Sequence, residues 1–252
     1  MLCKRQFNIL EARATDILNE VSYLQKGTGK DLVFFHGYLS SKEAFLAQIE
    51  YFSKYYKVTA IDFLGFGQSA PLTKAFSVAD YAEWTKTVLE ALKIQKPCVI
   101  AHSFGCRVAL KMAEEGGQVF DKLILTGPAG VIMNRGFSYR IKVRAYRLVK
   151  KLFPSFAEKR FGSVEYRSLS PIMKQSYKKI VNEDLREAAS RVQNEILILE
   201  GESDTTTPKR EAEAYLAVMQ RAKLVLLEGG HFAFVENPTV FNLLAEEFLR
   251  DV

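Results

Sequence analysis

Four short, almost entirely apolar runs, separated by long stretches with helical patterns, constrain the fold of this chain more than any other feature. They read LVFF, KLILT, ILILE and LVLLE. Strands of a parallel sheet read this way because helices cover both of its faces. Seven strands are expected: Asn19–Leu24, Leu32–Phe35, Tyr56–Ile61, Cys98–Ala101, Lys122–Thr126, Ile196–Glu200 and Lys223–Leu227. The alternation predicts an α/β fold with a mostly parallel central sheet flanked by helices.

The helices between these strands are expected at Ser41–Lys54, Ser77–Lys93, Phe104–Glu115, Pro208–Met219 and Pro238–Leu249. The alternation stops between Val131 and Val192, where basic amphipathic patterns replace any strand. We therefore expect residues 1–130 and 193–252 to form one α/β core. Residues 131–192 are expected to form a helical insertion over one edge of the sheet.

The charge of the chain is concentrated in that insertion. The whole chain has a net charge of +6, whereas residues 135–191 contain fifteen Lys or Arg against five acids. A solvated helical surface explains such a charge run, and attraction of an anionic substrate or an anionic membrane surface is the alternative. A second copy of the chain is a further candidate partner, so a homodimer stays open. No nucleic-acid motif accompanies the charge, and nucleic acid is not expected as a partner.

The first twenty residues carry charges throughout and lack the apolar core of a secretory signal. No apolar run approaches the roughly 20 residues that span a bilayer. Three cysteines without a CxxC pair suit reduced thiols, and they favour neither a disulfide framework nor a metal site. These features predict a cytoplasmic protein without a transmembrane segment.

Ser103 lies where an apolar strand passes directly into a helical pattern, in VIAHSFGCRVA. Such a tight corner forces its central residue into a sparsely populated backbone conformation and exposes the serine side chain. Small residues at Ala101 and Gly105 relieve the crowding, although Ala101 departs from the usual G-x-S-x-G pattern. The segment predicts a nucleophilic serine.

A serine nucleophile needs a general base that a third group orients. The chain has three histidines. His102 adjoins the serine, where a packing role is expected, and His36 follows a strand, where it is expected to brace a loop. His231 follows the last strand in a Gly-Gly turn, at the carboxyl edge where open α/β sheets bind ligands. We therefore predict His231 as the base.

The orienting acid is expected after a strand as well. GESDTTTP places Glu202 and Asp204 after the penultimate strand. Asp204 also suits a turn or capping role beside the threonines that follow it. The strand before the insertion ends at Thr126 without a carboxylate, and Asp62 is expected to brace the loop DFLGFGQS. Asp204 is the predicted acid.

Backbone amides are expected to stabilise the oxyanion. One belongs to Phe104, the residue after the nucleophile at a helix N-terminus. The other is expected from Tyr38 in HGYLSS, where Gly37 permits close approach of the backbone.

These segments together resemble the α/β-hydrolase fold superfamily. HGYLSS, DFLGFGQS, AHSFG, GESDTTTP and GGHFAFVENP occur in the order and spacing of that family. The resemblance implies a Ser103–His231–Asp204 triad, a Tyr38/Phe104 oxyanion hole and a helical cap over residues 131–192. A serine nucleophile argues against the haloalkane dehalogenase and epoxide hydrolase branches, which carry aspartate at this position.

The reaction expected from the resemblance is hydrolysis of a small-molecule carboxylic ester through an acyl-enzyme, with no cofactor and no metal. Arg107, four residues after the serine, looks like the elbow of the enzyme that eliminates pyruvate in menaquinone synthesis. With the basic cap it favours the alternative of a C–C hydrolase or lyase acting on a carboxylate-bearing substrate. Position i+4 also suits an arginine that pairs with a neighbouring acid. A non-catalytic receptor of the same fold is the third reading.

Residues next to the motifs are candidates for the substrate pocket, and packing in the cap is their alternative role. Besides Arg107 they are Phe66, Phe104, Val131, Tyr139 and Phe232.

Overall fold

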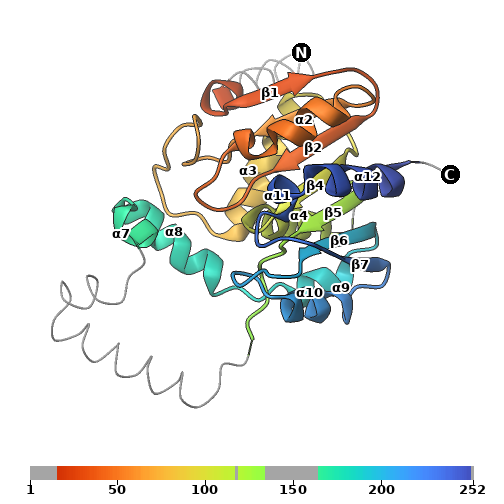
Figure 1. Ribbon diagram of the computed structural model, residues 1–252. Helices are drawn as coiled ribbons and strands as arrows, with labels where there is room; N and C mark the ends of the chain where they lie inside the picture. Colours follow the sequence, from red (N-terminus) through yellow and green to blue (C-terminus); the bar gives the residue numbers. More distant parts are fainter. Residues whose placement is uncertain (1–15, 117–118, 134–163, 251–252) are drawn as a thin grey trace.

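A computed structural model describes residues 16–116, 119–133 and 164–250, and their centre is a sheet of seven strands (Figure 1). The spatial order is β1-β3-β2-β4-β5-β6-β7. Only β1 pairs antiparallel, with β3, and the other neighbours are parallel. The strands are β1 (Tyr23–Lys26), β2 (Asp31–Phe35), β3 (Lys57–Ile61), β4 (Cys98–His102), β5 (Lys122–Thr126), β6 (Glu195–Gly201) and β7 (Ala222–Leu227). The predicted α/β class is confirmed.

The first strand begins later than the sequence predicts. Residues 16–20 are helical, and the amide of Val21 donates to the carbonyl of Ile17 at 3.1 Å. Val21 is buried in the core from this turn, whereas β1 pairs with β3 only from Tyr23 onward. The prediction of a strand over Asn19–Leu24 is therefore wrong for residues 19–22, because the chain is helical up to Glu20 and the buried valine directly follows that helix.

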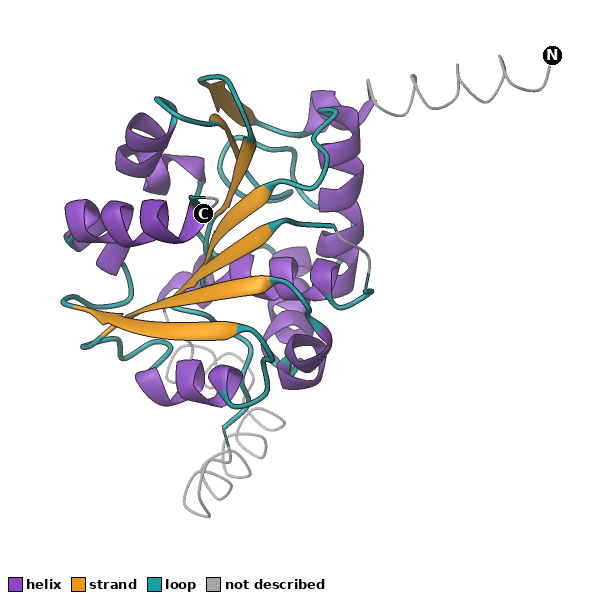
Figure 2. Ribbon diagram, turned by 90° about the vertical axis from the view of Figure 1, so that its right-hand side faces the viewer, coloured by secondary structure: helices purple, strands orange, loops and turns teal. Residues whose placement is uncertain are grey.

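Helices cover both faces of the sheet (Figure 2). One face carries η1 (Lys42–Phe45), α2 (Leu46–Phe52), α11 (Ala233–Glu236) and α12 (Pro238–Leu249). The other carries α3 (Val78–Ala91), α4 (Phe104–Ala113), α9 (Arg186–Arg191) and α10 (Lys209–Leu216). Neighbouring strand residues divide between these layers, since Phe34 and Ile100 lie in one core cluster and Phe35 and Ala101 in the other. This alternation is why both-face burial leaves uninterrupted apolar runs in the sequence.

The described part of the predicted insertion is helical. It comprises α7 (Val164–Ser168), α8 (Pro171–Val181) and α9, and Figure 1 shows α7 and α8 to one side of the sheet. Pro171 begins α8, with the Ser170 hydroxyl accepting a hydrogen bond from the amide of Met173 at 3.2 Å. The Ser176 hydroxyl accepts from the amide of Phe76, which fastens α8 to the loop before α3. No helix within the described ranges is both long and apolar enough to cross a bilayer.

The strand order places a topological switch point between β2 and β4. The chain goes from β2 to β3 on one side and then crosses to β4 on the other side of β2. Loops diverge at such a point and leave room at the carboxyl ends of the strands. The loop after β2 and the turn after β4 meet there. Their approach is so close that a Cβ on Gly37 would lie 2.8 Å from His102 Nδ1 and 3.5 Å from Ser103 Cβ. Gly37 therefore lets the two segments approach each other.

Candidate active site

Ser103 occupies the turn between β4 and α4 in a strained conformation. Its φ of 49° and ψ of −105° lie outside the regions that non-glycine residues prefer. The turn is held by the Ser103 amide, which donates to the Thr126 carbonyl at 3.0 Å. Gly105 lets α4 approach β2, since any Cβ there would overlap the carbonyl oxygen of Phe35. A strained, partly exposed serine at a strand–helix corner has the geometry of a nucleophile.

Asp204 and His231 form a hydrogen-bonded pair at the same edge of the sheet. The loop after β6 carries Asp204 and the loop after β7 carries His231, with 2.7 Å between Asp204 Oδ2 and His231 Nδ1. The Asp204 side chain is fully buried, whereas 14% of the His231 side chain is exposed. With Nδ1 donating to the carboxylate, the Nε2 atom of a neutral imidazole is left as the acceptor.

Four donors hold the Asp204 carboxylate in its ionised form. The amides of Thr206 and Thr207 donate to Oδ1 at 2.7 and 3.0 Å, and the Thr207 hydroxyl and His231 donate to Oδ2. Burial raises the pKa of Asp204, but the hydrogen bonds from His231 and Thr207 outweigh it and lower this pKa to about 2. The carboxylate is thus a permanent anion beside the imidazole at neutral pH.

His102 is buried next to this pair. Its Nε2 atom lies 2.9 Å from the main-chain oxygen of His231, and the two ring centroids are 4.6 Å apart. Burial lowers the pKa of His102 to about 3, so the ring is neutral and Nε2–H is the donor. His36 is also neutral, its pKa lowered to about 4 by burial, and its Nε2 accepts from the amide of Phe63 at 3.0 Å. His102 packs as expected, and it also holds the loop that carries His231.

The third side chain of the predicted triad is not hydrogen-bonded to the other two. Among the described residues, no hydrogen bond joins the Ser103 hydroxyl to the His231 imidazole. Ser103 adjoins His102, whose ring packs on that of His231, so the serine and the base share one neighbourhood. Hydrogen bonds between a nucleophile and its base are often loose in a ligand-free site and tighten around the substrate.

The two predicted oxyanion donors flank the switch point. Phe104 is the first residue of α4 and Tyr38 follows Gly37 in the loop after β2. Within the described ranges, neither amide donates a hydrogen bond to another protein group. The rings of Tyr38 and Phe104 pack edge-on with centroids 5.7 Å apart. Two free amides beside a strained serine, one of them at a helix N-terminus, can stabilise a developing negative charge.

The other predicted pocket residues differ in burial and in their position relative to the candidate active site. Phe66 is buried against Tyr38, with ring centroids 4.9 Å apart, and Val131 is buried after β5. Phe232 is 42% exposed beside the His102 ring. Tyr139 lies outside the described residues.

Arg107 has partners within the protein. Its Nη1 atom donates to the carbonyls of Ile180 and Glu183, at 2.7 and 2.9 Å, and the residue is 7% exposed. Ile180 lies in the last turn of α8 (Pro171–Val181) and Glu183 just after it, and an arginine interacts favourably with the carbonyls at this end of a helix. The contact differs from both roles expected of Arg107, substrate carboxylate binding and pairing with a nearby acid.

Two residues near the Asp204–His231 pair were not singled out from the sequence. The Thr207 hydroxyl donates to Asp204 Oδ2 at 2.9 Å and lies 3.1 Å from His231 Nδ1. Glu200, in the strand before Asp204, is fully buried. Its alternation with Ile196 and Ile198 in ILILE was the available signal, because it assigns a carboxyl group to a buried face.

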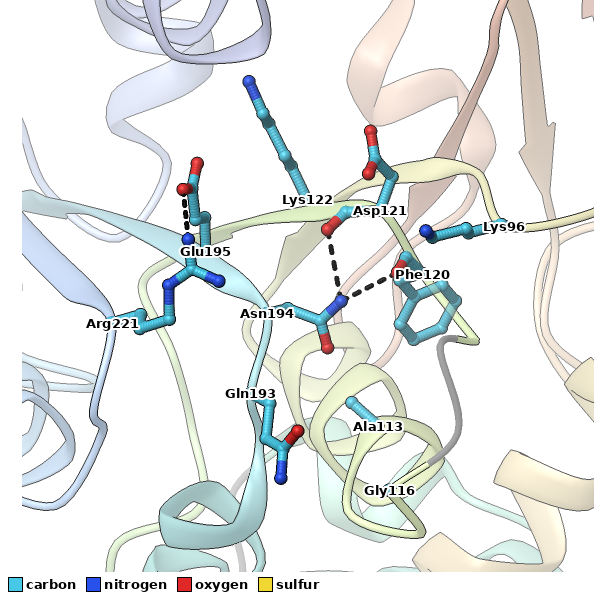
Figure 3. Close-up of a pocket in the computed structure, with 10 residues that line it drawn as sticks. All are labelled: Lys96, Ala113, Gly116, Phe120, Asp121, Lys122, Gln193, Asn194, Glu195 and Arg221. Carbon is cyan, nitrogen blue, oxygen red and sulfur yellow. Dashed lines mark hydrogen bonds and ion pairs between the residues drawn. The ribbon is translucent and has the colours of Figure 1, made fainter.

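A cavity of about 340 Å³ lies at the opposite, amino end of the parallel strands (Figure 3). Its polar contacts are structural, since Asn194 donates to the carbonyls of Phe120 and Asp121 and Arg221 pairs with Glu195. None of its lining residues is a serine or histidine. Among the described residues, no cluster of three or more His, Cys, Asp or Glu side chains could hold a metal ion. The chemistry of the described residues therefore places the candidate active site at the carboxyl edge of the sheet.

Comparison with known proteins agrees with this architecture. The family model described as alpha/beta hydrolase fold matches residues 31–164, more than half of the chain. An (E)-2-((N-methylformamido)methylene)succinate hydrolase from Acinetobacter baylyi is 36% identical over 83 residues. That segment covers 33% of this chain and 32% of the relative, so the match spans about a third of each protein.

Solved structures are similar over nearly the whole chain. An esterase (EaEST) from Exiguobacterium antarcticum has a TM-score of 0.73 at 22% identity, covering 92% of this chain and 96% of its own. A meta-cleavage product hydrolase (CumD) from Pseudomonas fluorescens IP01 has a TM-score of 0.70 at 21% identity, covering 90% and 93%. At these identities the similarity establishes a shared fold.

Proposed function

This chain belongs to the α/β-hydrolase fold family, and from that premise we propose that it is a serine hydrolase that cleaves carboxylic esters of small molecules. Ser103 is the proposed nucleophile, His231 the base and Asp204 the acid that orients it. The observation that carries the proposal is the 2.7 Å hydrogen bond between His231 Nδ1 and Asp204 Oδ2, at the sheet edge where Ser103 has a φ of 49°.

The proposed reaction has two halves. His231 Nε2 takes the Ser103 proton as the hydroxyl oxygen attacks the ester carbonyl, and Asp204 stabilises the imidazolium that forms. The amides of Tyr38 and Phe104 bind the oxyanion of the tetrahedral intermediate. Collapse of the intermediate expels the alcohol, which takes its proton from His231. Water then attacks the acyl-enzyme with His231 as base, releasing the acid and restoring Ser103.

Residues 131–192 are the proposed cap of this site. The described helices α7 and α8 support it, because the Tyr38 hydroxyl donates to the Met173 carbonyl and the Tyr38 ring packs on Tyr177, both in α8. Phe66, Val131, Phe232 and Tyr139 are its proposed pocket lining. We also expect the protein to be cytoplasmic and able to pair with a second copy of the chain.

A fluorophosphonate probe tests the nucleophile. We expect labelling of the wild type, loss of labelling in Ser103→Ala, and full labelling in the control Ser53→Ala, whose hydroxyl donates to the Glu50 carbonyl near the end of α2. Hydrolysis of p-nitrophenyl esters should disappear together with labelling. Tight binding of a small ligand with neither labelling nor turnover would favour the receptor reading instead.

The second candidate is a C–C hydrolase or lyase acting on a carboxylate-bearing substrate. The local similarity to a succinate-derivative hydrolase favours it. The engagement of Arg107 with the end of α8 weighs against it, because this guanidinium was the expected carboxylate ligand. Comparing p-nitrophenyl esters with vinylogous diketone acids separates the two, since turnover of the acids alone would overturn the ester proposal.

A further inference from the structure

Glu200 is a buried carboxyl group that the proposed reaction does not use. It lies near the end of β6 (Glu195–Gly201) and has no exposed surface. Alternation along the strand puts it on the same face as Ile196 and Ile198, which belong to the core cluster under α4 and α10. A carboxylate without partners is among the costliest groups to bury in such a place.

Nothing around Glu200 stabilises a negative charge. Within the described residues, neither Oε1 nor Oε2 of Glu200 has a hydrogen-bond partner. The titratable groups that face it are Asp204 from the loop after β6, Glu211 from α10 and Cys106 from α4. All three are acids, so an ionised Glu200 would have neither a donor nor a counter-ion.

A proton on Glu200 removes this difficulty. The carboxyl group is then a donor, and the Asp204 carboxylate, the first of the acids that face it, becomes its acceptor. Burial and the negative charge of Asp204 raise the pKa of Glu200 to about 9. Asp204 stays ionised because His231 and Thr207 donate to it. Two adjacent carboxyl groups thus hold one proton between them, and it lies on Glu200.

We propose that Glu200 is a positioning residue of the candidate active site, a neutral carboxylic acid that donates a hydrogen bond to Asp204 and holds that carboxylate toward His231. A neutral donor orients Asp204 without placing a second negative charge beside the imidazole. The kinetic consequence rests on the proposed function, whereas the protonation state of Glu200 does not.

Infrared difference spectroscopy tests the protonation state directly. Subtracting the spectrum of Glu200→Gln from that of the wild type at pH 7 should leave the C=O band of a protonated carboxyl group. A carboxylate band in its place would overturn the proposal. This measurement needs no enzymatic activity.

Unfolding by urea provides a second test that is independent of catalysis. Because the pKa of Glu200 in the folded protein lies above that of an unfolded glutamate, its contribution to stability is complete below about pH 4.5 and is lost as the pH rises toward 9. The urea midpoint of the wild type should therefore fall relative to that of Glu200→Gln between pH 5 and pH 9. Parallel midpoints across this range would contradict a neutral Glu200.

Ester kinetics test the positioning role. Glu200→Gln replaces one neutral donor with another, and should keep kcat and the acid limb of the pH–rate profile. Glu200→Leu has a similar size but no donor, and should lower kcat about tenfold with KM unchanged. Equal losses in both variants, or an acid limb displaced by about half a pH unit in Glu200→Gln, would overturn the role. If the wild type hydrolysed no ester, the proposed function would be wrong. The infrared and unfolding tests would still decide whether Glu200 is protonated.

Discussion

The Nε2 atom of His102 lies 2.9 Å from the main-chain oxygen of His231, so the residue before Ser103 holds the loop that carries the proposed base. His102→Phe keeps a ring at this position but removes the donor. Leaving the His231 carbonyl unpaired should cost about 1–3 kcal/mol in the free energy of unfolding. The ester kcat should fall more than KM rises, because the imidazole loses its orientation. Chemical denaturation and steady-state kinetics measure the two effects.

His102→Gln is the matched control for this change. Its amide can donate from a similar reach, and it should recover most of the kcat that His102→Phe loses. A phenylalanine variant with wild-type kcat and stability would show that the bond to the His231 loop contributes nothing.

Crowding at the switch point gives the second prediction. A Cβ on Gly37 would lie 2.8 Å from His102 Nδ1, although Gly37 has no positive φ. Gly37→Ala should therefore displace the loop after β2 and reduce ester kcat about a hundredfold, as loss of one oxyanion donor does. In Gly116→Ala, where φ is 74° and the Cβ meets nothing within 4 Å, we expect about 1–2 kcal/mol of backbone strain with kcat intact. Equal kcat in the two variants would argue against the crowding.

How much of this arrangement the sequence could predict depends on burial. Strands such as β2 and β6 leave apolar runs because both faces are covered, and the residue after each strand is then assigned to the carboxyl edge. The start of β1 could not be predicted in this way. β1 is an edge strand and is exposed at most positions, so its residues do not form the apolar run that marks the buried strands.

Side-chain partners were harder to predict than strand ends. Asp204 and His231 could be selected because few acids and histidines follow strands. The bond from Arg107 to the Ile180 carbonyl joins residues 73 positions apart, and no local pattern encodes it. The spacing of a sequence therefore predicts which residues lie at an edge of the sheet, but it does not predict which of their atoms form hydrogen bonds.

Arg107 leads to the third prediction. Its Nη1 donates to the carbonyls of Ile180 and Glu183, so Arg107→Met should release the end of α8 and cost about 2–3 kcal/mol of stability. Neutral and anionic esters should lose kcat/KM to the same extent, because no substrate charge is involved. Unchanged stability with a raised KM for anionic esters alone would instead identify Arg107 as a carboxylate ligand.

A buried ion pair under the loop after β3 gives the fourth prediction. Lys42 Nζ lies 2.7 Å from Asp62 Oδ2, and the two side chains are 9% and 0% exposed. The Asp62 carboxylate also accepts from the amides of Lys42 and Gln68, at 2.7 and 2.9 Å. Asp62→Asn removes the buried counter-ion of the ammonium group and leaves it only the half-exposed Glu43 carboxylate, 3.1 Å away, so the change should cost about 3 kcal/mol of stability.

A double-mutant cycle with Lys42→Met tests this coupling. Removing both charges should cost less than the sum of the two single changes, because neither variant group is then a buried unpaired ion. Additive losses in urea unfolding would show that the two charges do not stabilise each other.

The fifth prediction concerns the loss of folding stability at low pH. In the folded protein the pKa of Asp204 is lowered from 3.8 to about 2. A carboxylate of this kind contributes stability above the unfolded pKa and loses it as the pH falls through the folded one, so the contribution should disappear between about pH 4 and pH 2. Asp204→Asn should therefore be less stable than the wild type at pH 5, by on the order of 2 kcal/mol. The two urea midpoints should approach each other as the pH falls to about 2 and below, because Asp204 then becomes neutral like the asparagine. A constant difference over this range would show that the lost stability comes from hydrogen bonding alone.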